Sequence, residues 1–379
     1  MEIILPSTWH SCQHNCRRGA APQGKYKKFM KDSIPATRAQ LLKRAFPGGV
    51  PQLWCPPLTH YDRNGAIDGE RIAAHMRTLS PYVGGFLIPG STGDGWELTQ
   101  TERRQVLTIG LQQARELKVQ VLVGSLHPET SKTLVIIQED LDWLRASFGE
   151  NDTAKVLAKA HVCGFTICPP RGKELTQESI GGALTEILEL GLPTGIYQLP
   201  QVTLNEISSG TAAELAQRYE NFVFFKDTSG GDAVALSGKS LGGVFKARGA
   251  EGDYARWPSG AGGPYDGFLL ASANCFARQL QQMLTDISER RWEAARELSD
   301  RLTNVVTEML RRAAGLPDGN AFSNANKAMD HFFAYGPGAA AVSPPRLHAG
   351  SCLPLELIRA AEERLTRYGF MPAKGYLES

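Results

Sequence analysis

The most informative stretch of the sequence is NFVFFKDTSGG, residues 221–231, in which a lysine follows an apolar run. Four apolar residues, Phe222 to Phe225, predict a short buried strand. Lys226 comes directly after them, although burying an ammonium group is strongly unfavourable. A buried lysine has a lowered pKa, so its neutral amine can attack a carbonyl carbon near pH 7. The stretch therefore indicates an imine-forming lysine; exposure to solvent or pairing with Asp227 is the alternative.

Two other stretches supply groups that imine chemistry needs. Tyr197 lies in PTGIYQLP, residues 193–200, and can transfer a proton, although alone it could be an ordinary core aromatic residue. The stretch PGSTGDG, residues 89–95, contains Ser91, Thr92 and Gly93. Its hydroxyls and backbone N–H groups suit a carboxylate or phosphate, although alone it could be a simple turn. Together with the lysine, these stretches predict an imine-forming aldolase site.

These groups lie at the ends of predicted strands. Short apolar runs alternate with helical patterns, and eight candidate strands lie near residues 51, 85, 120, 165, 193, 222, 243 and 267. Parallel strands that are covered by helices are apolar almost throughout, as these are. The alternation predicts an α/β fold of the (β/α)8 barrel type, whose catalytic groups lie at the C-terminal strand ends. An open doubly wound sheet is the alternative, but no GxGxxG loop follows the first strand.

Three regions are predicted along the chain. Residues 1–33 lack a periodic apolar pattern and form a disordered tail or a mis-assigned start, with Met30 as a second candidate start. Residues 34–290 form the catalytic barrel, and residues 291–379 form a helical extension with helices near 291–315, 321–334 and 353–368. The tail stretch HSCQHNC has metal-binding residue types, but the distant second pair of a zinc site is not evident, so no metal is predicted.

Composition excludes several classes of protein. The formal net charge of +2 gives no electrostatic reason to expect nucleic acid or an anionic membrane as partner. No run of about 18 apolar residues predicts a transmembrane helix, and the N-terminus becomes polar too soon for a signal peptide. Seven scattered cysteines predict reduced thiols and a cytoplasmic location.

In order and spacing, the motifs resemble those of the dihydrodipicolinate synthase / N-acetylneuraminate lyase superfamily of class I aldolases. The resemblance covers about residues 48–315 and rests on GSTGD, YQLP, FFKDTSG and GFLLASAN. It implies a barrel enzyme for pyruvate or other 2-oxo acids, in which Lys226 forms the Schiff base, Tyr197 relays protons and Ser91 assists. It also implies a homotetramer or homodimer. The substrate-binding residues that follow from it are Thr92, Gly93, Thr228, Gly249, Leu269 and Glu251.

Departures from the family pattern bear on the substrate. In the synthases, a Pro-Tyr-Tyr pattern follows the fourth strand, and one of those tyrosines completes the relay across a dimer interface. Here CPPRGK places Pro170 and Arg171 there, and Val202 replaces the arginine that grips the aldehyde's carboxylate. Both changes argue against a true dihydrodipicolinate synthase. Thr228 resembles the threonine that holds the polyol tail in sugar-acid lyases, and Arg171 either faces an acidic substrate or lies near a subunit interface.

Three functions follow as hypotheses. The first is a class I lyase or aldolase that cleaves or condenses a pyruvate-type 2-oxo acid. Its candidate substrates are a 2-keto-3-deoxy sugar acid, an N-acetylneuraminate-like acid and the substrate of an aromatic hydratase-aldolase. The second is a Schiff-base dehydratase of a deoxy sugar acid, because an imine also supports loss of water. The third is a non-catalytic barrel that binds 2-oxo acids. The expected partners are a small 2-oxo acid and an aldehyde, and no cofactor is predicted.

Overall fold

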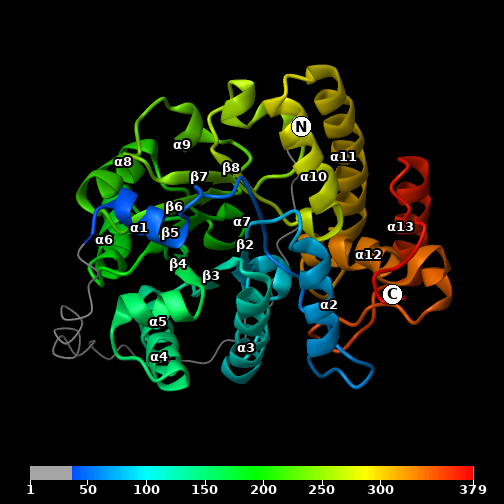
Figure 1. Cartoon of the computed structure of the whole chain (residues 1–379), viewed down its shortest axis with the longest axis horizontal. Helices are drawn as coiled ribbons and strands as arrows, with labels where there is room; N and C mark the ends of the chain where they lie inside the picture. The colour runs from blue at the N-terminus through cyan, green and yellow to red at the C-terminus, as the bar shows by residue number, and fades with distance from the viewer. Residues whose placement is uncertain (1–35, 379) are drawn as a thin grey trace.

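The computed structural model describes residues 36–378 and has the form of an α/β barrel (Figure 1). Eight parallel strands close the barrel in sequence order. They are β1 (Leu53–Cys55), β2 (Gly85–Ile88), β3 (Gln120–Gly124), β4 (Val162–Ile167), β5 (Thr194–Gln198), β6 (Phe222–Asp227), β7 (Phe245–Arg248) and β8 (Gly267–Leu269). The predicted (β/α)8 fold class is confirmed. The predicted tail, 1–33, and its HSCQHNC stretch lie outside the described residues.

Helices surround the barrel, although the last connections are irregular. The main covering helices are α2 (Gly69–Leu79), α3 (Gln100–Leu117), α4 (Thr130–Phe148), α5 (Thr153–Lys159), α6 (Gln177–Leu188), α8 (Ser209–Arg218) and α10 (Ala273–Ser288). A short helix, α7 (Pro200–Thr203), precedes α8, and β6 is followed by a single turn, α9 (Ala233–Leu236). Between β7 and β8 lie two 3-10 turns, η3 (Tyr254–Arg256) and η4 (Ser259–Ala261).

The fourth strand begins inside a stretch whose sequence pattern alone is typical of a helix. The stretch 152–164 has helical periodicity, but α5 ends at Lys159 and β4 begins at Val162. Val162 pairs with Val121 of β3, and every residue of β4 is buried. Pairing with the neighbouring strand therefore outweighs the local helical preference in this stretch.

The barrel interior is filled by side chains. Inward-facing residues from several strands form one cluster, which includes Trp54, Leu122, Phe224 and Leu269. The first helix, α1 (Arg38–Ala45), closes the N-terminal end, because Leu41 packs into the same cluster. Since this end is closed and the interior is packed, a ligand site is expected at the C-terminal strand ends.

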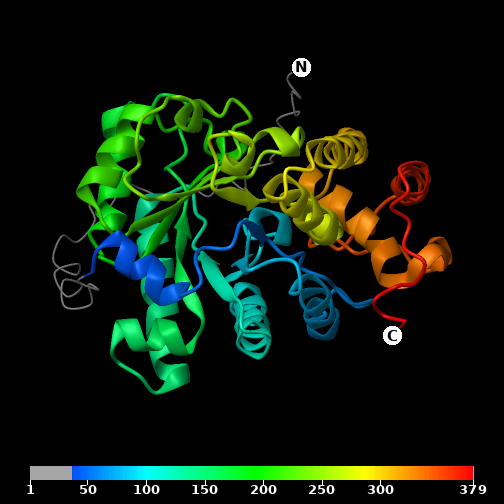
Figure 2. The ribbon, with the colours of Figure 1, turned by 45° about the horizontal axis from the view of Figure 1, so that its top comes forward.

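A group of C-terminal helices extends the fold on the side of α10 and α2 (Figures 1 and 2). It consists of α11 (Trp292–Ala313), α12 (Ala321–Tyr335), the 3-10 segment η5 (Gly336–Ala341) and α13 (Leu355–Arg367). The predicted C-terminal helical extension is thus confirmed. Across residues 36–378, no helix is long and apolar enough to cross a membrane.

Candidate active site

Lys226 lies inside the barrel near its C-terminal end. Side chains alternate along a strand, so Phe224, Lys226 and Thr228 share the inward face of β6. The lysine is only 4% exposed, and its Nζ lies 3.9 Å from the centre of the Tyr197 ring. Loss of hydration lowers the pKa of Lys226 to about 7, against the opposing influence of Cys168 and Glu251. A substantial fraction of the amine is therefore neutral and nucleophilic near pH 7.

Tyr197 and Ser91 stand beside the lysine. The pairing of β5 with β6 places Tyr197 opposite Lys226, and the tyrosine is 2% exposed. Burial raises the pKa of Tyr197, while hydrogen bonding by Ser91 and the nearby Thr228 hydroxyl acts in the opposite direction. Thr228 Oγ1 is itself buried and makes no hydrogen bond of regular geometry among the described residues. The structure thus brings together Lys226, Tyr197, Ser91 and Thr228.

Gly249, which follows β7, makes room for the lysine. A Cβ at this position would lie 2.3 Å from Thr228 Oγ1 and 2.8 Å from Lys226 Cε. The Gly249 N–H donates to the Asp227 carbonyl at 2.6 Å, so the backbone cannot easily move away. Leu269, also predicted to shape the pocket, lies in the packed interior cluster and is 1% exposed.

The loop after β2 contains the 3-10 turn η2 (Ser91–Gly93). Thr92 is 4% exposed, and carboxylate binding by this residue stays a prediction. The Gly93 N–H donates to the Gly90 carbonyl at 3.0 Å, and the Gly93 carbonyl accepts from Thr59 Oγ1 at 2.7 Å. Because Gly93 uses these backbone groups within the protein, its N–H would have to release Gly90 before it could bind an anion.

Glu251 and Arg171 are the remaining residues predicted to contact the substrate. The Glu251 carboxylate accepts hydrogen bonds from the Ser272 N–H at 2.9 Å, the Ser272 hydroxyl at 2.6 Å and the Tyr254 hydroxyl at 2.8 Å. Burial raises the pKa of Glu251, so this carboxyl is held by the protein in a desolvated position. Arg171 is exposed in the loop after β4. In the described chain, no hydrogen bond or ion pair joins its guanidinium to the group around Lys226.

Trp96 is a site residue that the sequence motifs do not predict. Its Nε1–H donates to Ser91 Oγ at 2.8 Å, and its ring packs against the cluster that contains Tyr197 and Cys168. An indole N–H donates but cannot accept a proton. Because the Trp96 N–H donates to the Ser91 oxygen, the hydrogen of the Ser91 hydroxyl must point elsewhere. The orientation in which this hydrogen points to Tyr197 is therefore favoured.

Helix α12 holds the Ser91 loop from outside the barrel. Asp94 adopts a left-handed backbone conformation, with φ of 59°, and is 3% exposed. Its carboxylate accepts from Lys327 at 2.7 Å, Ser323 at 2.9 Å and Tyr61 at 3.0 Å. The Asn320 side chain also donates to the Ser91 carbonyl at 3.1 Å. The C-terminal helices therefore fix the loop that carries the proton-relay serine.

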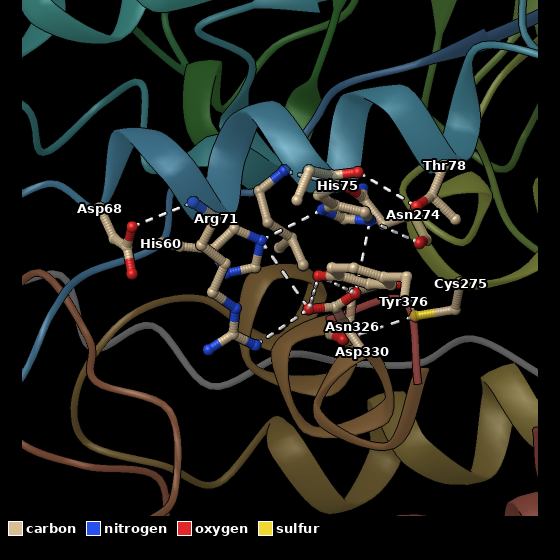
Figure 3. Close-up of polar contacts among 12 residues, drawn as sticks. His60, Asp68, Arg71, His75, Thr78, Asn274, Cys275, Asn326, Asp330 and Tyr376 are labelled. Atoms are coloured by element: carbon tan, nitrogen blue, oxygen red, sulfur yellow. Dashed lines mark hydrogen bonds and ion pairs between the residues drawn. The ribbon is translucent and has the colours of Figure 1, made fainter. Parts of the chain in front are cut away.

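A second buried polar cluster joins the barrel to α12 and to the C-terminal segment (Figure 3). His60 Nε2 and His75 Nδ1 lie 3.1 Å apart, and His75 Nε2 lies 2.8 Å from the Asn274 carbonyl. Asp330 lies at the centre and accepts from Arg71 at 3.2 Å and from the Tyr376 hydroxyl at 3.1 Å. Desolvation lowers the pKa of His60 well below its ordinary value, so this imidazole is neutral.

The ligand atoms of His60, His75 and Asp330 lie within 4.8 Å of one another, a grouping that could hold a metal ion. However, the Arg71 guanidinium already neutralises Asp330 and would repel a second cation. Hydrogen bonding between the two histidines also accounts for their approach. We therefore assign this cluster a structural role as the junction between the barrel and the C-terminal helices.

Comparison with solved structures agrees with the observed fold. A dihydrodipicolinate synthase from Thermotoga maritima has a TM-score of 0.64 and 17% identity, covering 85% of this chain and 99% of the other. A prophage protein of E. coli from the dihydrodipicolinic acid synthase family, solved in complex with pyruvate, has the same TM-score and identity. It covers 84% of this chain and 99% of its own.

Sequence comparison extends the likeness beyond the fold. The chain is 26% identical over 276 residues to the 4-hydroxy-tetrahydrodipicolinate synthase of Novosphingobium aromaticivorans, covering 72% of this chain and 85% of that enzyme. It is 23% identical over 260 residues to the enzyme of the same name from Agrobacterium fabrum, covering 68% and 80%. The chain is similar in sequence and in fold to members of the dihydrodipicolinate synthase superfamily. No protein-family profile matches it, and its identity to these superfamily members is low.

Proposed function

We propose that the chain is a class I lyase or aldolase that cleaves or condenses a pyruvate-type 2-oxo acid through a Schiff base at Lys226. The observation that carries this proposal is the buried lysine itself, with a pKa of about 7 and its Nζ 3.9 Å from the Tyr197 ring centre. A desolvated amine at the end of a barrel strand suits attack on a carbonyl carbon. Similarity to the synthases of this superfamily supports the same reaction class.

The chemistry follows from the arrangement of the side chains. The neutral Lys226 amine attacks the C2 carbonyl of the 2-oxo acid, and water leaves as the imine forms. Tyr197, hydrogen-bonded to Ser91, moves a proton to or from the substrate. Thr228 and Thr92 are buried hydroxyls beside this centre, and we assign them the polar end of the substrate. Gly249 leaves the space in which the imine forms.

A true dihydrodipicolinate synthase is not the proposed identity. Pro170 and Arg171 occupy the places of the synthase tyrosines, and Val202 occupies that of the synthase arginine. The resemblance, through Thr228, favours a 2-keto-3-deoxy sugar acid or a related compound. We further propose that the chain forms a homotetramer or homodimer and is located in the cytoplasm.

Reductive trapping tests the mechanism. The protein is incubated with pyruvate and sodium borohydride, digested and analysed by mass spectrometry. We expect a stable pyruvate adduct on the peptide that contains Lys226, and no adduct in Lys226→Met. Lys239→Met, which removes an exposed lysine, is the matched control and should be labelled like the parent protein. Absence of the adduct, while a known class I aldolase is labelled under the same conditions, would rule the mechanism out.

Product analysis separates the proposed reaction from its alternatives. Aldol cleavage releases pyruvate together with an aldehyde, whereas dehydration yields one unsaturated or rearranged acid and no aldehyde. A binding barrel would trap pyruvate on Lys226 but would turn over none of a broad panel of 2-oxo acids.

A further inference from the structure

The residues around Lys226 divide the mouth of the barrel into two unlike halves. Beside β6 to β8 lie polar groups, among them the Thr228 hydroxyl and the Glu251 carboxyl. Beyond β3 to β5, the inward-facing side chains are Leu126, Cys168 and Leu199. These three form one buried cluster with Tyr197, which we call the apolar wall.

The apolar wall lies at the level of the reactive amine. Leu126 follows the last residue of β3 by two positions, and Cys168 and Leu199 each follow the last residue of their strands by one. Inward-facing positions alternate along each strand, and the pairing of β5 with β6 aligns Tyr197 with Lys226. Cys168 is also close enough to influence the pKa of Lys226. The wall therefore faces the space where a substrate bound to the lysine must extend.

Two half-buried residues, Trp96 and Val202, extend the apolar wall outward by packing against it. The Trp96 N–H is already used by Ser91. Burial raises the pKa of Cys168, so its side chain is a neutral thiol that behaves as a small apolar group. Apart from the Tyr197 hydroxyl, the side chains of this wall thus offer no free hydrogen-bonding group.

We propose that the substrate carries a planar apolar group, an aryl ring, at the carbon that becomes the aldehyde. The inference rests on the imine mechanism of the proposed function and replaces the sugar-acid substrate favoured there with an aryl substrate. A polyol chain against this wall would leave its hydroxyls without partners, which is costly. An aryl ring would bury apolar area and stack against Trp96. This reverses the preference for a sugar acid that Thr228 alone suggests, because one hydroxyl cannot satisfy a polyol.

The substrate class is then a 4-aryl-4-hydroxy-2-oxobutanoate. The Lys226 amine adds to C2, Tyr197 gives its phenol proton to the departing C2 oxygen, and loss of water leaves a protonated imine and a tyrosinate. The C3–C4 bond breaks, its electron pair moves toward the imine to give an enamine, and Tyr197 accepts the proton of the C4 hydroxyl. The aryl aldehyde leaves, Tyr197 returns the proton to C3, and water hydrolyses the imine to pyruvate and free lysine.

The test compares pyruvate release from 4-hydroxy-2-oxo-4-phenylbutanoate and from 2-keto-3-deoxygluconate. We expect kcat/KM to favour the phenyl compound on the order of 100-fold, the discrimination typical of an apolar pocket. Val202→Asn, which keeps the size of the side chain, should raise KM for the phenyl compound by about 10-fold with little change in kcat. Val135→Asn, at a 49% exposed position on α4, is the matched control and should leave both constants unchanged.

Each outcome bears on one of the two proposals. Faster cleavage of the sugar acid, or an unchanged KM in a folded Val202→Asn variant, overturns the aryl assignment. If Val202→Asn does not fold, Val202→Ala takes its place, and an unchanged KM there has the same meaning. Pyruvate trapping on Lys226 without cleavage of the phenyl compound also overturns the aryl assignment but leaves the imine mechanism standing. No trapping at all overturns the mechanism, and the substrate with it.

Discussion

Replacing Lys226 by methionine should abolish imine formation and, at the same time, stabilise the folded protein. Methionine has nearly the same length, so it fills the space without leaving a large cavity. The lysine is 4% exposed and its pKa falls from 10.5 to about 7 because its charged form loses hydration. Holding the amine in the barrel therefore costs folding free energy, and the methionine variant is free of that cost.

The size of the effect follows from the two pKa values. The unfolded chain keeps the lysine proton up to about pH 10.5, whereas the folded protein loses it above about pH 7. Between these values the unfolded state binds more protons, so the stability of the parent protein rises with pH. Since each tenfold change in proton affinity is worth about 1.4 kcal/mol, the variant should gain roughly 4 kcal/mol at pH 7. The gain should fall by about 1.4 kcal/mol per pH unit and vanish near the unfolded pKa.

Urea unfolding at pH 7, 8 and 9 measures this difference. The free energy of unfolding of Lys226→Met should exceed that of the parent protein most at pH 7, and the gap should narrow at each higher pH. Lys239→Met, the exposed control, should stay within about 0.5 kcal/mol of the parent protein throughout. A methionine variant no more stable than the parent at pH 7, or a gap that does not change with pH, would show that the amine is not desolvated as described.

Further substitutions test the other parts of the site. Tyr197→Phe should lower kcat about 10²- to 10⁴-fold, the usual contribution of a proton-transfer group, yet still permit borohydride trapping of pyruvate; loss of trapping would contradict a relay role. Gly249→Ala should block trapping, because the alanine Cβ would lie 2.3 Å from Thr228 Oγ1. An adduct formed at the parent rate would refute this close packing. Lys327→Met should destabilise the fold by about 3–5 kcal/mol in urea unfolding by leaving Asp94 buried and unpaired. The Asp94→Asn/Lys327→Met double variant should recover much of that loss, and failure to do so would mean that the ion pair is not the cause.

Features confined to one stretch of sequence were predictable. Lys226 stands out because burial and charge conflict within five consecutive residues, Phe222 to Lys226. The strands follow from short apolar runs, and the capping box that opens α3 follows from Thr99 and Glu102, whose reciprocal hydrogen bonds the structure contains. In each case the physical cause is local.

Features that depend on distant contacts were not predictable. Asp94 has no assigned role in the sequence, because its partner Lys327 is 233 residues away. Trp96 could not be placed either, since its hydrogen bond to Ser91 depends on how the loop turns back at Asp94. The start of β4 is misplaced for the same reason, because pairing with β3 decides where Val162 lies.

The contacts that hold the Ser91 loop against α12 also have a consequence for biosynthesis. Lys226 and all eight barrel strands leave the ribosome before α12 does, yet Ser91 is hydrogen-bonded to Asn320, 229 residues later. During synthesis, domains fold as their segments emerge, so a nascent barrel can enclose its lysine while the relay serine still lacks its anchor. A chain cut or stalled before α12 would then hold a reactive amine without an organised proton relay. The protein would therefore become catalytically competent only after its C-terminal helices have been synthesised.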